Sequence, residues 1–362
     1  MYSYKILKTD MKKTAYNGQE YLNKIYSGLS YYIKSAPVLG NLRLMILALV
    51  CGCQESLINE NAIDVKSVQI VFEDLPIKTL DIFMFEDGEM TTLDSYQRID
   101  APHEWEVLTA SRKGSRTTFI LANGHWQKED WMAVNSYESL KGIRSNLEHE
   151  SHAFPVMSAE YRFCADGKQK IWMELKSLCS EVELRSVSCD FGGKNYEEEG
   201  ITEMKAYLVN VNAQSMLMRG DVVMPERIIN VGCLNDDDMA MMKEPELLFR
   251  KIGHLSSGNS LQTRFGFRCY PNNSPEESPG SPFTRLVIEG KIGEHIYYWP
   301  INVGRNYEQY NNGVSGNTRY IYDVTITGKG SDSPDIPVSS KVIGLKMEVL
   351  TWKEKDEYII CY

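Results

Sequence analysis

Short apolar runs separated by turn residues are the feature that most constrains the fold of this 362-residue chain. Many runs after Cys53 alternate apolar with polar residues, which is the period of a half-buried strand. Pro, Gly, Ser and Asn clusters, typical of turns, separate them. The pattern predicts an all-β protein with few short helices. The main runs are SVQIVF (67–72), LDIFMF (80–85), KIWMEL (170–175), VELRSVSC (182–189), MKAYLVNV (204–211), TRLVIEGKI (284–292), HIYYWPINV (295–303), RYIYDVTITG (319–328) and LKMEVLTW (345–352).

Local patterns in the first half make more specific predictions. LDIFMF (80–85) is apolar on both faces, which predicts a buried central strand. WEVLTA (105–110) and RTTFILANG (116–124) flank Lys113-Gly114 and are interpreted as a hairpin. The segment from Met132 to Gly142 is predicted as a helix that ends at the glycine.

The length of the chain favours more than one domain. Turn signals at Asp166-Gly167 precede a restart of the strand pattern, and the residues after 52 are many for a single sandwich. We therefore expect two tandem β-sandwich domains, at residues 53–167 and 168–362, after a separate segment at residues 1–52.

The segment 1–52 has the features of a lipoprotein signal. It carries seven Lys/Arg and two Asp/Glu, whereas the remaining residues carry 32 and 47. The apolar run Leu44 to Val50 is far shorter than the roughly 20 residues that span a bilayer, and Lys34 and Arg43 precede it. Val50-Cys51-Gly52-Cys53 then resembles a bacterial lipobox, with an aliphatic residue three positions before Cys53. We expect lipid attachment at Cys53 and an outer-membrane location; the alternative is a buried strand or helix start.

Charge and cysteine spacing limit the partners. The net charge of −10 argues against nucleic acid as a partner. The eight cysteines include no Cys-X-X-Cys pair, and no His stands at zinc-finger spacing from them, so free thiols and disulfides both stay open.

No motif predicts catalysis, a metal site or a cofactor. His149 and His152 are three residues apart, not the four of a zinc-protease helix. The acidic run 236–238 lacks the alternating spacing of a calcium loop. No nucleophile elbow, Walker loop or dinucleotide fingerprint is present. We predict that the protein is not an enzyme.

The aromatic run HIYYWP allows two interpretations. It could form a sugar-stacking platform; at strand spacing, Tyr297 and Trp299 share one face and Tyr298 takes the other, as in a core strand with a rim.

Several stretches together resemble the Bacteroidales fimbrillins, the family of major and minor fimbrial subunits and their anchor proteins. The stretches cover about residues 68 to 352 and are TRYIYDVTITGKGSDSPDIPV (318–338), VIGLKMEVLTW (342–352), LVIEGKIGEHIYYWPINVG (286–304), EMKAYLVNV (203–211), IKTLDIFMFEDGEM (77–90), TTFILANG (117–124) and FPVMSAEYRF (154–163).

The resemblance implies two transthyretin-like β-sandwich domains in tandem, made as a lipoprotein. It also implies other fimbrial subunits as partners, joined by strand exchange. In shaft subunits a protease removes the first strand after an Arg, and C-terminal strands of a neighbour fill the groove. The tail of this chain has donor-strand character; the donor candidates are Ile343, Leu345, Met347, Val349 and Ile359. The alternative is that these residues close their own sandwich.

The first strand departs from the shaft pattern. Only Glu73 to Pro76 link SVQIVF to the next strand, and the first Arg after Cys53 is Arg98, beyond both. We therefore expect the first strand, with Val68, Ile70 and Phe72 on one face, to be retained. A subunit that donates a strand but cannot accept one is an anchor or basal subunit. The alternatives are a polymerising shaft or tip fimbrillin, and a surface lipoprotein that binds glycans or host ligands.

Overall fold

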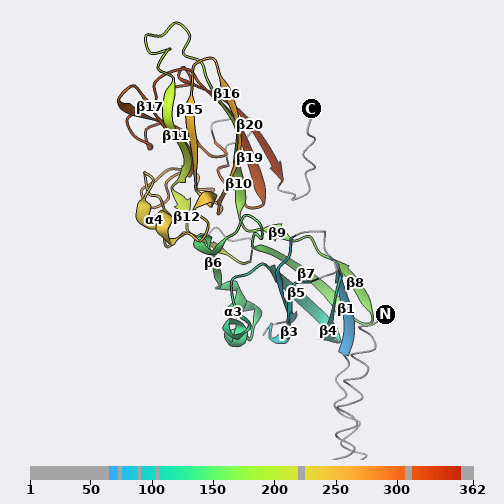
Figure 1. The fold of residues 1–362 in the computed structure, drawn as a ribbon. Helices are drawn as coiled ribbons and strands as arrows, with labels where there is room; N and C mark the ends of the chain where they lie inside the picture. Colours follow the sequence, from blue (N-terminus) through green and yellow to red (C-terminus); the bar gives the residue numbers. More distant parts are fainter. Residues whose placement is uncertain are drawn as a thin grey trace, which may run out of the picture. The chain divides into compact units, whose positions relative to one another are not determined.

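The structure, a computed structural model, describes residues 65–71, 76–88, 91–102, 106–218, 225–305 and 312–351. All of these belong to one compact unit, Val65–Tyr362. Strands dominate this part of the chain, and its few helices are short (Figure 1). None of those helices has the length and hydropathy needed to cross a bilayer. The expected all-β class is confirmed.

Two sheets form the N-terminal sandwich. In the larger sheet the strand order is β3-β2-β5-β7-β9, and in the smaller one it is β4-β1-β8. Their bounds are β1 Val65–Val71, β2 Thr79–Glu86, β3 Leu93–Asp100, β4 Glu106–Arg112, β5 Gly114–Ala122, β7 Met157–Ala165, β8 Gln169–Trp172 and β9 Lys176–Ser177.

The core of this sandwich comes from the alternation of its strands. Leu80, Ile82 and Met84 of β2 point to one side and pack against Val68 and Ile70 of β1, all at most 1% exposed. The predicted hairpin from residues 105 to 124 is wrong, because β4 pairs with β1 and β5 pairs with β2 and β7. The single residue between β4 and β5 therefore carries the chain from one sheet to the other.

The second face of the larger sheet is also buried. Phe83 and Phe85 of β2 contact Trp131 and Tyr137 edge-on, which confirms the prediction that β2 is a buried central strand. The residues that cover this face form η1 (Lys128–Ala133), α3 (Tyr137–Lys141), β6 (Arg144–Asn146) and η2 (Leu147–His149). The predicted helix from Met132 is too long, because η1 ends at Ala133, the chain is extended at Val134, and Ser136 caps a separate helix, α3, which ends at Gly142 as predicted.

The C-terminal sandwich has two four-stranded sheets, in the orders β16-β10-β19-β20 and β15-β11-β17-β18. Aromatic side chains such as Trp299, Tyr320 and Tyr322 fill the space between them and are fully buried. The bounds are β10 Ser180–Cys189, β11 Ile201–Val209, β15 Phe249–Leu255, β16 Ser260–Cys269, β17 Arg285–Ile292, β18 His295–Asn302, β19 Thr318–Ile326 and β20 Ile343–Thr351.

Polar and apolar contacts join the two halves. β6 of the first half pairs with β13 (Gln214–Met216) of the second. The buried Glu150 carboxylate accepts hydrogen bonds from the Tyr270 hydroxyl at 2.8 Å and from the Val156 N–H at 3.0 Å. The remaining elements of this region are β12 (Val211–Asn212), β14 (Ile228–Ile229), α4 (Asp236–Met241) and η3 (Pro245–Leu247). The boundary at residues 167/168 stays a prediction; β8 and β9, which follow it in the sequence, belong to the N-terminal sheets.

Candidate functional site

The first strand is the central strand of its sheet. β1 pairs antiparallel with β4 along seven residues, from Val65 to Val71, and parallel with β8 along four, from Val68 to Val71. Both neighbours therefore take up the backbone hydrogen bonds of the strand, while its apolar side chains enter the core. The predicted residues Val68 and Ile70 are both fully buried, and Phe72 lies outside the described residues. Without β1, a slot would separate β4 from β8.

An ion pair crosses the outer side of this strand. Lys170 Nζ of β8 lies 2.8 Å from Glu106 Oε1 of β4, although β1 runs between the two strands. The ammonium of Lys170 lowers the pKa of Glu106, and its Nζ also lies 5.3 Å from the centroid of the Trp172 ring. Because both charged side chains are half exposed, the pair is weak in energy. Its position shows that β4 and β8 are linked directly across the outer face of β1.

The backbone just before β2 is held by the side chain of Asn123. Residues 72–75 lie outside the described residues, but the carbonyl of Pro76 accepts a hydrogen bond from Asn123 Nδ2 at 2.9 Å. The Asn123 Oδ1 accepts the N–H of Lys78 at 2.7 Å. Asn123 itself has φ +60°, a left-handed conformation that Asn tolerates. The backbone is therefore held by side-chain hydrogen bonds at Pro76 and Lys78, directly before β2 begins.

The last described strand, β20, is an edge strand of the C-terminal sandwich. It pairs with β19 along its whole length, from Ile343 to Thr351. The donor candidate Ile343 is buried, and Met347 and Val349 are partly buried against the core of their own sandwich. Leu345 is 36% exposed, and Ile359 lies outside the described residues. In this chain, residues 343–351 therefore occupy their own sheet; their role as donor stays a prediction.

A charged network holds β20 on the outer face of that sheet. Arg185 of β10 bonds to Asp323 of β19 through Nε at 3.0 Å and to Glu348 of β20 through Nη2 at 2.9 Å. Ser186 Oγ donates a further bond to Asp323 at 2.6 Å. The guanidinium of Arg185 lowers the pKa of both Asp323 and Glu348. The network joins strands that are distant in the sequence but neighbours in the sheet.

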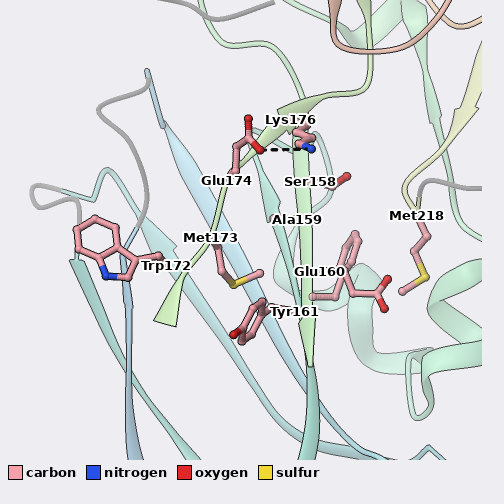
Figure 2. A pocket seen from close by; sticks show the side chains of 10 residues that line it. Ser158, Ala159, Glu160, Tyr161, Trp172, Met173, Glu174, Lys176 and Met218 are labelled. Atoms are coloured by element: carbon pink, nitrogen blue, oxygen red, sulfur yellow. Dashed lines mark ion pairs between the residues drawn. The ribbon is translucent and has the colours of Figure 1, made fainter. Parts of the chain in front are cut away.

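A hollow of about 370 Å³ lies beside the outer edge of β7. Consecutive residues from Ser158 to Tyr161 line one side of it, Trp172 to Glu174 line the other, and Lys176 lies next to Ser158 (Figure 2). Lys176 Nζ pairs with Glu174 Oε2 at 3.3 Å, and the Trp172 ring points away from Tyr161. These groups form no set of nucleophile, base and oxyanion donor, so the hollow has the features of a gap between strand edges.

The histidines and the acidic run that the sequence analysis considered contact other side chains of the fold. The ring of His149 lies 4.5 Å from the ring of His125, tilted by 45°, and burial lowers the pKa of His125 to about 4. His152 Nε2 lies 3.4 Å from an Arg250 nitrogen. The acidic run 236–238 begins α4, where Asn235 caps the helix, and Asp238 Oδ1 pairs with Arg227 at 3.0 Å. Across the ranges that the structure describes, no group of three or more His, Cys, Asp or Glu is arranged to hold a metal ion.

The aromatic run of β18 is built into the core. Trp299 is fully buried and donates its Nε1–H to the carbonyl of Gly328 at 3.0 Å. Tyr297 packs on the same core, while Tyr298 contacts a smaller cluster on the other face of the sheet. The structure therefore favours the core interpretation over a sugar-stacking platform.

Several features were missed by reasoning from the sequence. The pair between Glu106 and Lys170, the network of Arg185 and the open edge of β7 all depend on which strands are neighbours. Period-two patterns indicate the face on which a side chain lies, but not which strand lies beside it. Only the alternating charges Glu160 and Arg162 in β7, and Lys346 and Glu348 in β20, indicated solvent-facing positions.

Known structures share this fold. A fimbrilin from Porphyromonas gingivalis superposes with a TM-score of 0.59 at 12% identity, covering 79% of this chain and 97% of the other. A candidate cell adhesion protein from Bacteroides eggerthii gives a TM-score of 0.62 at 15% identity, covering 80% and 96%. Another candidate cell adhesion protein, from Parabacteroides distasonis, gives a TM-score of 0.55 at 14% identity, covering 80% of this chain and 100% of the other.

These comparisons show a similarity of fold. No protein-family model matches the chain, and no curated protein matches it. The chain therefore has the tandem β-sandwich fold seen in a fimbrilin and in candidate adhesion proteins of the Bacteroidales, as its sequence resemblance predicts.

Proposed function

We propose that the protein is a structural subunit of cell-surface fimbriae, held in the outer membrane by lipid on Cys53, that acts as an anchor or basal subunit. Its partners are other fimbrial subunits, to which it donates a C-terminal strand. The proposal assigns the chain no catalysis. A fold shared with a fimbrilin and with candidate adhesion proteins supports the fimbrial part.

The position of β1 is the observation that carries the anchor role. Strand exchange needs an empty slot in the accepting domain, and here β1 fills the slot between β4 and β8. Its buried side chains and its two ladders both oppose its removal. A subunit whose own first strand stays in place cannot accept a neighbour there, so it ends the filament at the cell.

The test is the mass of the amino terminus of the protein extracted from membranes. The anchor proposal expects a lipid-modified Cys53 followed by an intact first strand. A mature start between β1 and β2 would instead make the protein a shaft subunit.

A second experiment tests the lipid alone. Cys53→Ala should move the protein out of the membrane fraction, whereas Cys51→Ala should leave it there. Retention of the Cys53→Ala protein at the unsubstituted level would contradict the lipid anchor. Fimbriae that assemble normally and do not co-purify with the protein would favour a surface lipoprotein that binds glycans or host ligands.

A further inference from the structure

The outer edge of β7 is open along most of its length. β7 pairs with β5 along all nine residues, but β9 covers its other side only at Met157 and Ser158. Within the part of the chain that the structure describes, no strand pairs with that side from Ala159 onward. An open strand edge carries backbone donors and acceptors ready for another strand.

The direction of these backbone groups follows from bonds at both ends of β7. On the side away from β5, the Val156 carbonyl accepts the N–H of Leu178 at 2.9 Å, and the Cys164 carbonyl accepts from Gln169 Nε2. Backbone groups of a strand alternate with period two. The N–H and C=O groups of Glu160 and Arg162 therefore also point to the open side.

Space and side-chain charge on this edge favour an incoming strand. The hollow of about 370 Å³ runs beside residues 158–161, and Trp172 to Glu174 form its other wall (Figure 2). Glu160 and Arg162 are partly and largely exposed, at 34% and 67%, and their closest charged atoms are 4.0 Å apart. Between them stands Tyr161, which is 46% exposed.

We propose that this edge pairs with the same edge of a second copy of the chain, antiparallel and with a twofold axis at Tyr161. In that register Glu160 faces the partner's Arg162, and Arg162 faces the partner's Glu160. These two residues also carry the free backbone groups, so each pair exchanges two backbone hydrogen bonds and one ion pair. Identical edges related by a twofold axis form a closed, isologous contact.

The charges select this register. A twofold axis at Glu160 would place Glu160 opposite the partner's Glu160, and an axis at Arg162 would place Arg162 opposite the partner's Arg162. Like charges directly opposite each other are unfavourable. With the axis at Tyr161, which lies between these two residues, both Glu160 and Arg162 face a residue of opposite charge. Because the ladder is short and its ion pairs are exposed, the dimer is weak and depends on protein concentration.

Cysteine cross-linking tests the register residue by residue. Tyr161 faces the partner's Tyr161 at a non-hydrogen-bonded position, where Cα atoms are about 4.5 Å apart, within disulfide range. In the detergent-solubilised full chain, Tyr161→Cys should give an oxidised dimer. Arg162→Cys should not, because it faces the partner's Glu160. The unsubstituted chain sets the background from the exposed Cys164 and Cys233. Equal dimer yields from the two variants would overturn the proposal.

Charge reversal tests the interface without cross-links. Glu160→Arg should weaken dimerisation in sedimentation equilibrium at least tenfold, since it sets two Arg residues against each other twice. The double variant Glu160→Arg/Arg162→Glu should restore it, because the pairs re-form with exchanged signs. A double variant as weak as the single one, a single variant that dimerises normally, or an unsubstituted chain that stays monomeric at high concentration would each overturn the proposal.

Discussion

Lys170 Nζ and Glu106 Oε1 lie 2.8 Å apart across the first strand of the protein, which runs between the strands that carry them. The two side chains are linked over the outer face of β1, while Val68 and Ile70 fill the core beneath it. The first strand is thus enclosed by two ladders, a core and an ion pair. This enclosure makes β1 an integral part of the folded subunit.

Truncation of Ile70 should destabilise the protein strongly if β1 belongs to the mature fold. The side chain is fully buried, so Ile70→Ala is expected to lower the free energy of unfolding by about 2–5 kcal/mol. The neighbouring Gln69→Ala, on the outer face of the same strand, is the matched control and should change it little. Urea denaturation of both variants measures the difference. Equal stabilities would mean that β1 is not part of the cooperative unit.

Loss of Arg185 should loosen β20 in its own sheet. Arg185→Ala removes the cation that bonds Asp323 and Glu348, leaving two carboxylates side by side. We expect faster amide hydrogen exchange in residues 343–351 than in β11, which lies in the opposite sheet. Lys341→Ala, an exposed cation just before β20, is the control. Unchanged exchange in the Arg185 variant would show that the backbone ladder alone holds the strand.

The same network predicts a dependence on pH. Arg185 lowers the pKa of Asp323 and of Glu348 below their ordinary values of 3.8 and 4.5. The stability that these groups contribute is therefore complete above their ordinary pKa values and is lost as the pH falls through the lowered ones. Acid unfolding below about pH 4.5 should be less steep in Asp323→Asn than in the unsubstituted chain. An identical slope in the two proteins would contradict the role of Asp323.

Removal of the Tyr270 hydroxyl should lower the free energy of unfolding more than removal of a matched surface hydroxyl. Tyr270 and Tyr137 both donate to a glutamate at 2.8 Å, but the first pair is buried and the second is exposed. Tyr270→Phe removes the hydroxyl donor of the buried Glu150 carboxyl, which should lower the free energy of unfolding by about 1–3 kcal/mol. Tyr137→Phe should cost about 0.5 kcal/mol or less. Thermal unfolding of the two variants gives the comparison. Equal losses of stability would contradict a stabilising role for the hydrogen bond between Glu150 and Tyr270.

Deletion of the tail tests strand donation, which rests on the proposed function. Removing residues 353–362 should weaken attachment of a partner fimbrial subunit while leaving β20 intact. Replacement of Ile359 and Ile360 by Asp is the finer variant, because it keeps the length and removes the apolar character. Co-purification of fimbrial subunits from cells is the measurement. Normal assembly with either variant would assign the tail to local structure.

Much of the fold was predictable because it depends on local periodicity. The runs at residues 80–85 and 319–328 each became a strand, most of the run 204–211 lies in β11, and the two apolar faces of β2 correctly predicted a strand buried on both sides. The hairpin at residues 105–124 was wrong, and the helix from Met132 was too long, although a helix does end at Gly142 as predicted. A turn signal indicates where a strand ends but not the sheet to which the next strand belongs, and helical spacing does not exclude an extended stretch that tertiary contacts favour.

The sequence by itself determined the class of fold and the alternation of buried and exposed side chains, because these depend on residues that are neighbours along the chain. Only the tertiary structure decided that β1 lies between β4 and β8, that Arg185 joins β10, β19 and β20, and that the edge of β7 is open. The physical reason is that hydrogen bonds between strands use backbone groups that every residue shares. The choice of partner strand therefore depends on how the whole set of sheets packs and buries its apolar faces.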